Sequence, residues 1–185
     1  MTQWFENIEI GEKHTLGQHT FEHDEIVRFG TAYDPQYFHI DDDAAEHSHF
    51  DGIIASGWHT ACVGHRLLVD AITQQTADLI EAGETPGEAG PSPGVNVMEF
   101  KTPVRPGDTI TYTFWVEAKR VSNSLPGWGV LTEWIEAHNQ NGELVYKVQF
   151  AGFVKRRDYT PKLSERLALF AAQNPLLRRF LSGRG

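Results

Sequence analysis

A change in the spacing of apolar residues divides this chain of 185 residues into two parts. From Ser56 to about Ile80, apolar residues recur every three or four positions, which predicts one long helix capped by Ser56. From Val95 onward they recur at every second position, which predicts strands. Strands segregated from one dominant helix are typical of an α+β fold. The apolar stripe expected to be buried on the helix comprises Trp58, Ala61, Cys62, His65, Leu68, Val69 and Ile72.

The rest of the chain can be divided in the same way. A first strand is expected at about 13–21, followed by a short helix with Asp24 at its N-cap and an end before Pro35. The polar segment 34–51 is expected to be an irregular loop with one helical turn near 44–47. Four strands are predicted in the second part, separated by two Pro-Gly turns and one Asn-Gly turn: 95–104, 109–122, 129–139 and 144–154.

One helix can cover only one face of such a sheet. The other face and the edge strands then expose apolar surface and unpaired backbone groups. Dimerisation through the sheet is the most economical way to cover them. We therefore expect a homodimer or a higher homo-oligomer.

Composition excludes several classes of protein. The chain is 40% hydrophobic and 22% charged, which excludes a mostly disordered protein. Its apolar runs are too short for a transmembrane helix, so no membrane partner is expected, and the N-terminus lacks the pattern of a secretory signal. The single cysteine, Cys62, excludes an intrachain disulfide and a zinc ribbon, and it favours a cytoplasmic location.

Charge is distributed unevenly along the chain. Residues 155–185 contain eight Lys or Arg and two acidic residues, whereas residues 1–154 carry a net charge of −15. The negative charge of residues 1–154 repels the phosphate backbone of nucleic acids, so no nucleic-acid partner is expected. The basic tail could contact a nucleic acid, a membrane or an anionic ligand, but docking on the acidic part of the chain or on another subunit is the favoured interpretation. We divide the chain into a domain, 1–155, and a basic helical extension, 156–185, with an amphipathic helix at 163–181 that is interrupted at Pro175.

Two short motifs could carry chemistry. Asp34 and His39 lie five positions apart in the polar loop, where a carboxylate and an imidazole could share one water as an acid–base pair. Ser56 and Gly57 begin the long helix, where free backbone N–H groups can stabilise an oxyanion. Each motif also has a purely structural interpretation: Asp34 would stabilise a turn beside an exposed His39, and Ser56 would only cap the helix.

Together the two motifs resemble those of the MaoC-like dehydratases, the family that includes the (R)-specific enoyl-CoA hydratases. That family has the motif Asp-x-Asn-Pro-x-His, and here Asp34 and His39 occupy the acidic and basic positions. Gln36 replaces the family's Asn and Tyr37 its Pro. The segments 50–57 and 104–109 resemble the family's entry into its central helix and its Pro-Gly-Asp turn, and the resemblance spans about residues 4–155.

The resemblance implies a hot-dog fold, in which an antiparallel sheet wraps around one long central helix. It also implies a hydro-lyase that adds water reversibly to a trans-2-enoyl-CoA, giving an (R)-3-hydroxyacyl-CoA without a cofactor. Asp34 and His39 would be catalytic, the Gly57 N–H would bind the enolate oxygen, and Ser56 would orient Asp34 or cap the helix. The substrate would be a thioester of CoA or of acyl carrier protein. Residues that could also line the site are Gln36, Tyr37 and His59.

Other interpretations remain open at this point. A hot-dog thioesterase would use a carboxylate with the same helix N-terminus, and a non-catalytic acyl-binding subunit would use neither motif chemically. The His and Asp residues between His39 and His49 could suggest a metal site, but a solvated surface is the favoured interpretation and no metal is expected. Cys62 and His65 are expected to be buried core residues.

Overall fold

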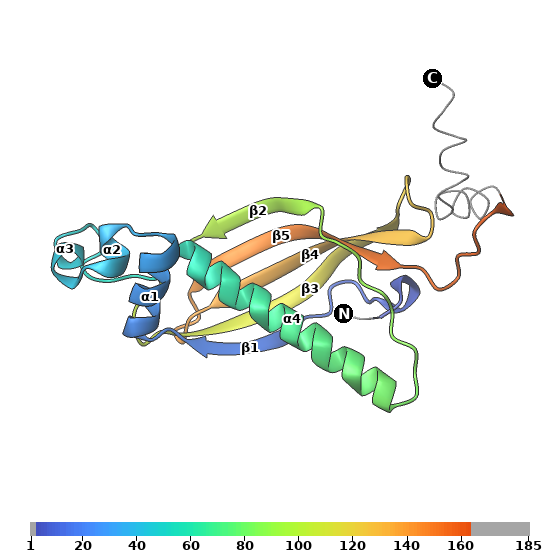
Figure 1. Cartoon of the computed structure of the whole chain (residues 1–185), viewed down its shortest axis with the longest axis horizontal. Helices are drawn as coiled ribbons and strands as arrows, with labels where there is room; N and C mark the ends of the chain where they lie inside the picture. The colour runs from blue at the N-terminus through green and yellow to red at the C-terminus, as the bar shows by residue number, and fades with distance from the viewer. Residues whose placement is uncertain (1–2, 164–185) are drawn as a thin grey trace, which may run out of the picture.

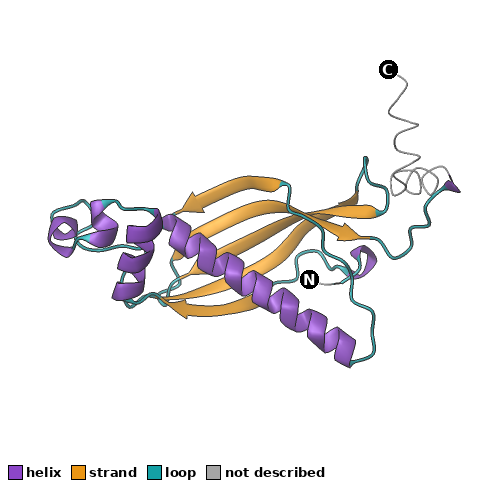
Figure 2. Ribbon diagram, viewed as in Figure 1, coloured by secondary structure: helices purple, strands orange, loops and turns teal. Residues whose placement is uncertain are grey.

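The computed structural model describes residues 3–163 and contains one antiparallel sheet with one long helix across its face (Figures 1 and 2). The strand order is β1-β3-β4-β5-β2. Three small helices form a cap at one end of the long helix, where its N-terminus lies (Figure 1). The elements are η1 (Phe5–Asn7), β1 (His14–Thr20), α1 (His23–Tyr33), α2 (Tyr37–Ile40), α3 (Asp42–Glu46), α4 (Gly57–Glu81), β2 (Gly94–Phe100), β3 (Thr109–Val121), β4 (Trp128–His138) and β5 (Leu144–Lys155).

Alternating side chains on the strands build the core between the sheet and α4. On β3, Ile110, Tyr112, Phe114 and Val116 are buried, as expected for one face of a strand with period two. The helix crosses the sheet closely at Gly64, where a Cβ atom would lie 2.8 Å from the Tyr112 ring. The Tyr112 hydroxyl donates a hydrogen bond to the carbonyl of Thr60 at 3.0 Å. This contact fixes the first half of α4 on the middle of the sheet.

The expected long helix and strands are present, with small differences at their ends. The N-cap role of Asp24 is wrong, because α1 begins at His23 and places Asp24 inside its first turn. The polar segment is more regular than expected: it contains α2, and α3, which Asp41 caps by accepting a hydrogen bond from the Ala44 N–H. Strand β2 ends at Phe100, four residues before the predicted end of the strand.

The prediction of which α4 residues are buried is wrong for much of the apolar stripe. Trp58 and Val69 are 58% and 43% exposed, and Cys62 and His65 are also exposed. Among the described residues, α4 buries His59, Thr60, Gly64 and Leu68. The helix packs on the sheet with the face that carries Thr60 and Gly64, because these small residues allow a close approach. Much of the apolar stripe therefore faces a groove.

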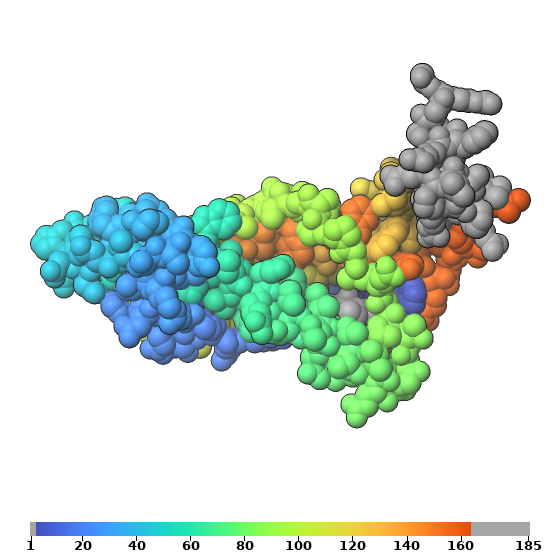
Figure 3. Space-filling model, viewed as in Figure 1, coloured from blue at the N-terminus to red at the C-terminus, as the bar shows by residue number. Residues whose placement is uncertain are grey.

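That groove runs along α4 beside β2 and β5. It has a volume of about 520 Å³ and apolar walls that include Val69 of α4, Met98 of β2 and Phe150 of β5. Figure 3 shows β5 exposed between α4 and β2 along this line. Five of the seven side chains that were expected in the core thus line a solvent-open groove in the single chain, whereas Leu68 is buried as expected and Ile72 packs against the core.

Some predictions lie outside the described residues. The helix at 163–181 and most of the basic extension fall there. Within residues 3–163, none of the helices has the length and apolar character needed to cross a membrane.

Candidate active site

Three helix ends converge at the cap of the molecule. Asp34 is the C-cap residue of α1, His39 lies on α2, and Gly57 begins α4. The chain can bring α2 this close to α1 because Gly30 has no side chain. A Cβ atom at Gly30 would lie 3.0 Å from both the Cβ and the carbonyl oxygen of His39.

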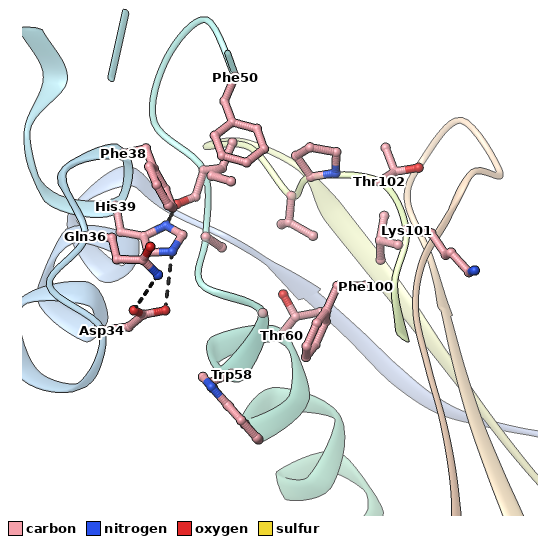
Figure 4. A pocket seen from close by; sticks show the side chains of 16 residues that line it. Asp34, Gln36, Phe38, His39, Phe50, Trp58, Thr60, Phe100, Lys101 and Thr102 are labelled. Atoms are coloured by element: carbon pink, nitrogen blue, oxygen red, sulfur yellow. Dashed lines mark hydrogen bonds and ion pairs between the residues drawn. The ribbon is translucent and has the colours of Figure 1, made fainter. Parts of the chain in front are cut away.

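Asp34 and His39 face each other at the bottom of this junction. The Nε2 atom of His39 lies 3.4 Å from Oδ2 of Asp34 (Figure 4). His39 is buried, with only 3% of its surface exposed. The other ring nitrogen, Nδ1, lies 2.7 Å from the carbonyl oxygen of Ile54. A carbonyl only accepts, so Nδ1 must carry the proton in the neutral ring. Nε2 therefore carries a lone pair in the neutral ring, and in the protonated ring it carries an N–H that faces Oδ2 of Asp34.

The Asp34 carboxylate is held by two further donors. The Ser56 hydroxyl donates to Oδ2 at 2.6 Å, and the Gln36 amide donates to Oδ1 at 2.9 Å. Burial by itself raises the pKa of Asp34, but these two hydrogen bonds and the nearby His39 outweigh it and hold the pKa below its ordinary value. Asp34 is thus an anion of fixed orientation at neutral pH.

Ser56 and Gly57 place a helix N-terminus beside this anion. The Ser56 hydroxyl oxygen also accepts a hydrogen bond from the Trp58 N–H at 3.2 Å, which confirms its capping position. Within the described chain, the Gly57 N–H has no hydrogen-bond partner. The Phe100 ring packs on Gly57, since a Cβ atom there would lie 2.9 Å from it. A free N–H at a helix start can bind a developing negative charge.

These groups open into one cavity of about 360 Å³. Figure 4 shows Asp34, Gln36 and His39 on one side and Phe100, Lys101 and Thr102 on the other. The remaining walls are mostly apolar, which suits an acyl chain better than a sugar or a phosphate. Apolar side chains in these walls include Phe38, Phe50, Ile54, Val104 and Val145.

Two predicted lining residues lie elsewhere. Tyr37 is 49% exposed, packs edge-on against Phe38 and is absent from the cavity wall. His59 is buried under the site and hydrogen-bonded to Glu25, with no surface in the cavity. Gln36 does line the cavity, as expected.

Several site residues were not predicted from the sequence. Phe38 and Phe50 are apolar residues inside a polar segment, and that contrast could have indicated a role as cavity walls. Phe100 and Lys101 had no such indication, because their approach to Gly57 depends on how β2 pairs with β5. Among residues 3–163, no group of three or more His, Cys, Asp or Glu side chains is arranged so that it could hold a metal ion.

A family model described as the MaoC-like domain matches residues 6–126. The chain therefore belongs to the MaoC-like dehydratase family. An uncharacterised protein of Bacillus subtilis, YdeM, is 33% identical over 136 residues, which is 72% of this chain and 85% of YdeM.

Solved structures support the same family and fold. A MaoC-like dehydratase from Rhodospirillum rubrum is 30% identical, with a TM-score of 0.68 over 84% of this chain and 99% of that one. An (R)-hydratase from A. caviae involved in PHA biosynthesis has a TM-score of 0.53 at 22% identity, over 81% of this chain and 98% of that one, a likeness of fold alone. The predicted family and hot-dog fold are confirmed.

Proposed function

We propose that this MaoC-like protein catalyses the reversible addition of water to a trans-2-enoyl thioester. The observation that supports this most directly is the Asp34–His39 pair, 3.4 Å apart and adjacent to the free Gly57 N–H. Hydration of a conjugated thioester needs a site for water, a proton carrier and a donor for the enolate oxygen. The three groups meet these needs without a metal or a cofactor.

In the proposed reaction, a water molecule lies between the Asp34 carboxylate and the His39 Nε2 atom. Its oxygen bonds to the β-carbon, while the Asp34–His39 pair takes one of its protons. The electron pair of the carbon–carbon double bond shifts to form a double bond between the α-carbon and the carbonyl carbon, and the carbonyl electron pair moves to the oxygen, where the Gly57 N–H stabilises the enolate. The pair then returns a proton to the α-carbon, so that one water has been added and the enzyme is restored. The proton is assigned here to the pair and not to one of its two members.

Ser56 and Gln36 serve this reaction by holding the carboxylate still. One hydrogen bond reaches each carboxylate oxygen, so rotation of the Asp34 side chain would break at least one of them. A fixed carboxylate leaves the water only a few productive positions. Tyr37 and His59, which lie outside the cavity, have no direct contact with substrate in this mechanism.

The thioester would be carried by CoA or by acyl carrier protein, and the product would be the (R)-3-hydroxyacyl thioester. This assignment follows the family and the name of the A. caviae (R)-hydratase, and the apolar walls of the cavity agree with an acyl substrate. A cytoplasmic location would fit such a substrate, and it stays a prediction from the single cysteine.

We also propose that two copies associate through the groove beside α4. Val69 on the helix and Val95 on β2 are each about half exposed there, next to the free edge of the sheet. Contiguous apolar surface of this kind marks an interface in soluble proteins. A second copy offers the same helix face and the same strand edge, so a two-fold axis would cover both at once.

Purified protein with crotonyl-CoA, and then with enoyl-CoAs of increasing chain length, tests the proposed reaction. A hydratase removes the absorbance of the conjugated thioester and releases no free CoA, and chiral analysis of the product should give the (R) isomer. Release of free CoA would instead indicate a thioesterase. No change with any member of the series would indicate a non-catalytic acyl-binding subunit.

A further inference from the structure

A second cluster of titratable side chains lies directly beneath the cavity. Nε2 of His59, on α4, is 3.1 Å from Oε1 of Glu25, on α1. Nε2 of His19, on β1, lies 3.0 Å and 3.2 Å from the two oxygens of the same carboxylate. One carboxylate therefore ties together three elements, and the proposed reaction uses none of these side chains.

The His59 ring is enclosed on all the sides that the described residues define. It is 4% exposed, it stacks on Phe29 with ring centroids 4.5 Å apart and an interplanar angle of 5°, and it meets the edge of Phe21 at 4.9 Å. Its Nδ1 atom is buried and has no hydrogen-bond partner among residues 3–163. Burying an imidazole with one nitrogen unpaired costs free energy of folding. The presence of a histidine at this position, hydrogen-bonded only to Glu25, therefore needs an explanation.

The position of the His59–Glu25 hydrogen bond between α1 and α4 offers an explanation. His59 lies one helical turn after Ser56 on α4, and Glu25 lies in the first turn of α1, the helix that ends at Asp34. The helices α1 and α4 are thus joined by two polar ties: Ser56 to Asp34 at the site, and His59 to Glu25 beneath it. A single tie would let α1 pivot about it, whereas two ties fix both the position and the direction of α1.

We infer that Glu25 and His59 are positioning residues that hold the Asp34 carboxylate in register with the Gly57 N–H. This inference rests on the proposed function for its catalytic consequence. Neither residue touches the cavity, so each acts only through the placement of α1 on α4. His19 supports the pair by fixing the Glu25 carboxylate from the side of β1.

The charge state of the pair is consistent with this role. Burial lowers the pKa of His59, despite the neighbouring Glu25, and the charges of His19 and Arg28 act in the same direction as burial. Burial raises the pKa of Glu25, but hydrogen bonds from His19 and His59 outweigh it and lower the pKa overall. At neutral pH a neutral His59 therefore donates its Nε2–H to an ionised Glu25. Protonation at acid pH would place a second N–H, on Nδ1, where the described chain offers no acceptor.

The variant His59→Phe tests the inference, because it keeps an aromatic ring on Phe29 and removes the hydrogen bond. We expect kcat to fall roughly 10- to 100-fold with KM changed less than about threefold, as for a small misplacement of a catalytic group. Glu25→Ala should lower kcat by a similar factor. Glu25→Gln keeps a hydrogen-bond acceptor for His59 and should retain most of the activity. His47→Phe, at an exposed histidine on the surface of the cap, is the matched control.

A double-mutant cycle separates positioning from a general loss of stability. Because His59 acts through Asp34, adding His59→Phe to Asp34→Asn should lower the remaining rate no further. A full additional loss of rate in the double variant would overturn the inference. So would a His59→Phe protein that melts at a lower temperature but keeps the kcat of the wild type.

One readout does not depend on hydratase activity. The pKa of the Asp34 carboxyl, followed by carbon NMR, should rise in His59→Phe because the Ser56 hydrogen bond loosens, and should stay unchanged in His47→Phe. An unchanged pKa in His59→Phe would overturn the inference. Wild-type protein that hydrates no enoyl-CoA would instead reject only the proposed function, and the NMR result would still decide the positioning role.

Discussion

At the scale of single residues, the candidate site depends on how one carboxylate is held. Asp34 contacts Ser56, Gln36 and His39, and each contact favours its ionised form. A carboxylate with a lowered pKa is a weaker base, but it stays ionised and oriented over a wide range of pH. In the pair, this places a fixed negative charge 3.4 Å from the Nε2 atom of His39.

Ser56→Ala should shift the pH dependence of the reaction. Loss of the hydroxyl removes the 2.6 Å hydrogen bond, so the pKa of Asp34 should rise and the acid limb of kcat/KM should move to higher pH. Ser56→Thr keeps a hydroxyl and should leave the limb close to that of the wild type. An acid limb that is identical in the alanine variant would contradict the role given to this bond.

The same variant should lose stability with a defined pH dependence. Loss of the N-cap of α4 should cost about 1 kcal/mol at any pH. Because the folded pKa of Asp34 is lowered, its contribution is present above the unfolded pKa and disappears as the pH falls through the folded pKa. Urea unfolding should therefore show a larger difference between the two proteins at pH 7 than in acid.

Residue spacing allowed the reactive groups to be predicted, but not their surroundings. Asp34, His39, Ser56 and Gly57 form two short motifs that can be read along the chain. The walls come from segments that are distant in sequence, such as Phe100, and their placement depends on strand pairing. His59 was assigned to the cavity because of its position next to the motif, and the packing of α1 on α4 instead buries it.

At the scale of elements, the close approach of α1 and α2 determines where His39 lies. Gly30 makes this approach possible, and its neighbours there include backbone atoms, which cannot rotate away. The distance between the two helices therefore sets the distance between the imidazole and the carboxylate.

Gly30→Ala should displace α2 and lower kcat. The added methyl group would lie 3.0 Å from the His39 backbone, so α2 must shift by a few tenths of an ångström. We expect a loss of activity of about tenfold or more, since small misplacements of catalytic groups are costly. Gly94→Ala, where the added methyl group meets open space on β2, is the matched control. Equal kcat values for the two variants would contradict this account of α2.

The long helix α4 illustrates what periodicity can and cannot predict. The sequence correctly predicted the Ser56 cap, the start at Gly57 and the approximate length of the helix. It also identified an apolar face, but not which surface that face would meet. In the single chain, Gly64 and Thr60 face the sheet, because small residues permit close packing on Tyr112. Leu68 is also buried, whereas Trp58 and Val69 face the groove.

At the scale of the whole molecule, the apolar residues of α4 that line the groove stay exposed to solvent in the single chain. A second copy that covers the groove would bury them. We expect light scattering to give about twice the 20.8 kDa mass of one chain. Val69→Glu places a charge in the groove and should shift the protein toward the monomer. Ile80→Glu changes an exposed apolar residue on the same helix, outside the groove walls, and should leave the mass unchanged. A wild-type protein of about 21 kDa would reject the dimer.

The fold, the cap and the helix N-terminus together place one carboxylate–imidazole pair in a cavity of about 360 Å³, and the activity of Asp34→Asn tests the proposed role of that pair most directly. Asparagine keeps the shape and removes the charge, so an unchanged melting temperature would isolate the chemical effect. We predict that the rate of enoyl-CoA hydration falls by about 10²- to 10⁴-fold. A folded Asp34→Asn protein that hydrates enoyl-CoA at the wild-type rate would contradict the proposed mechanism.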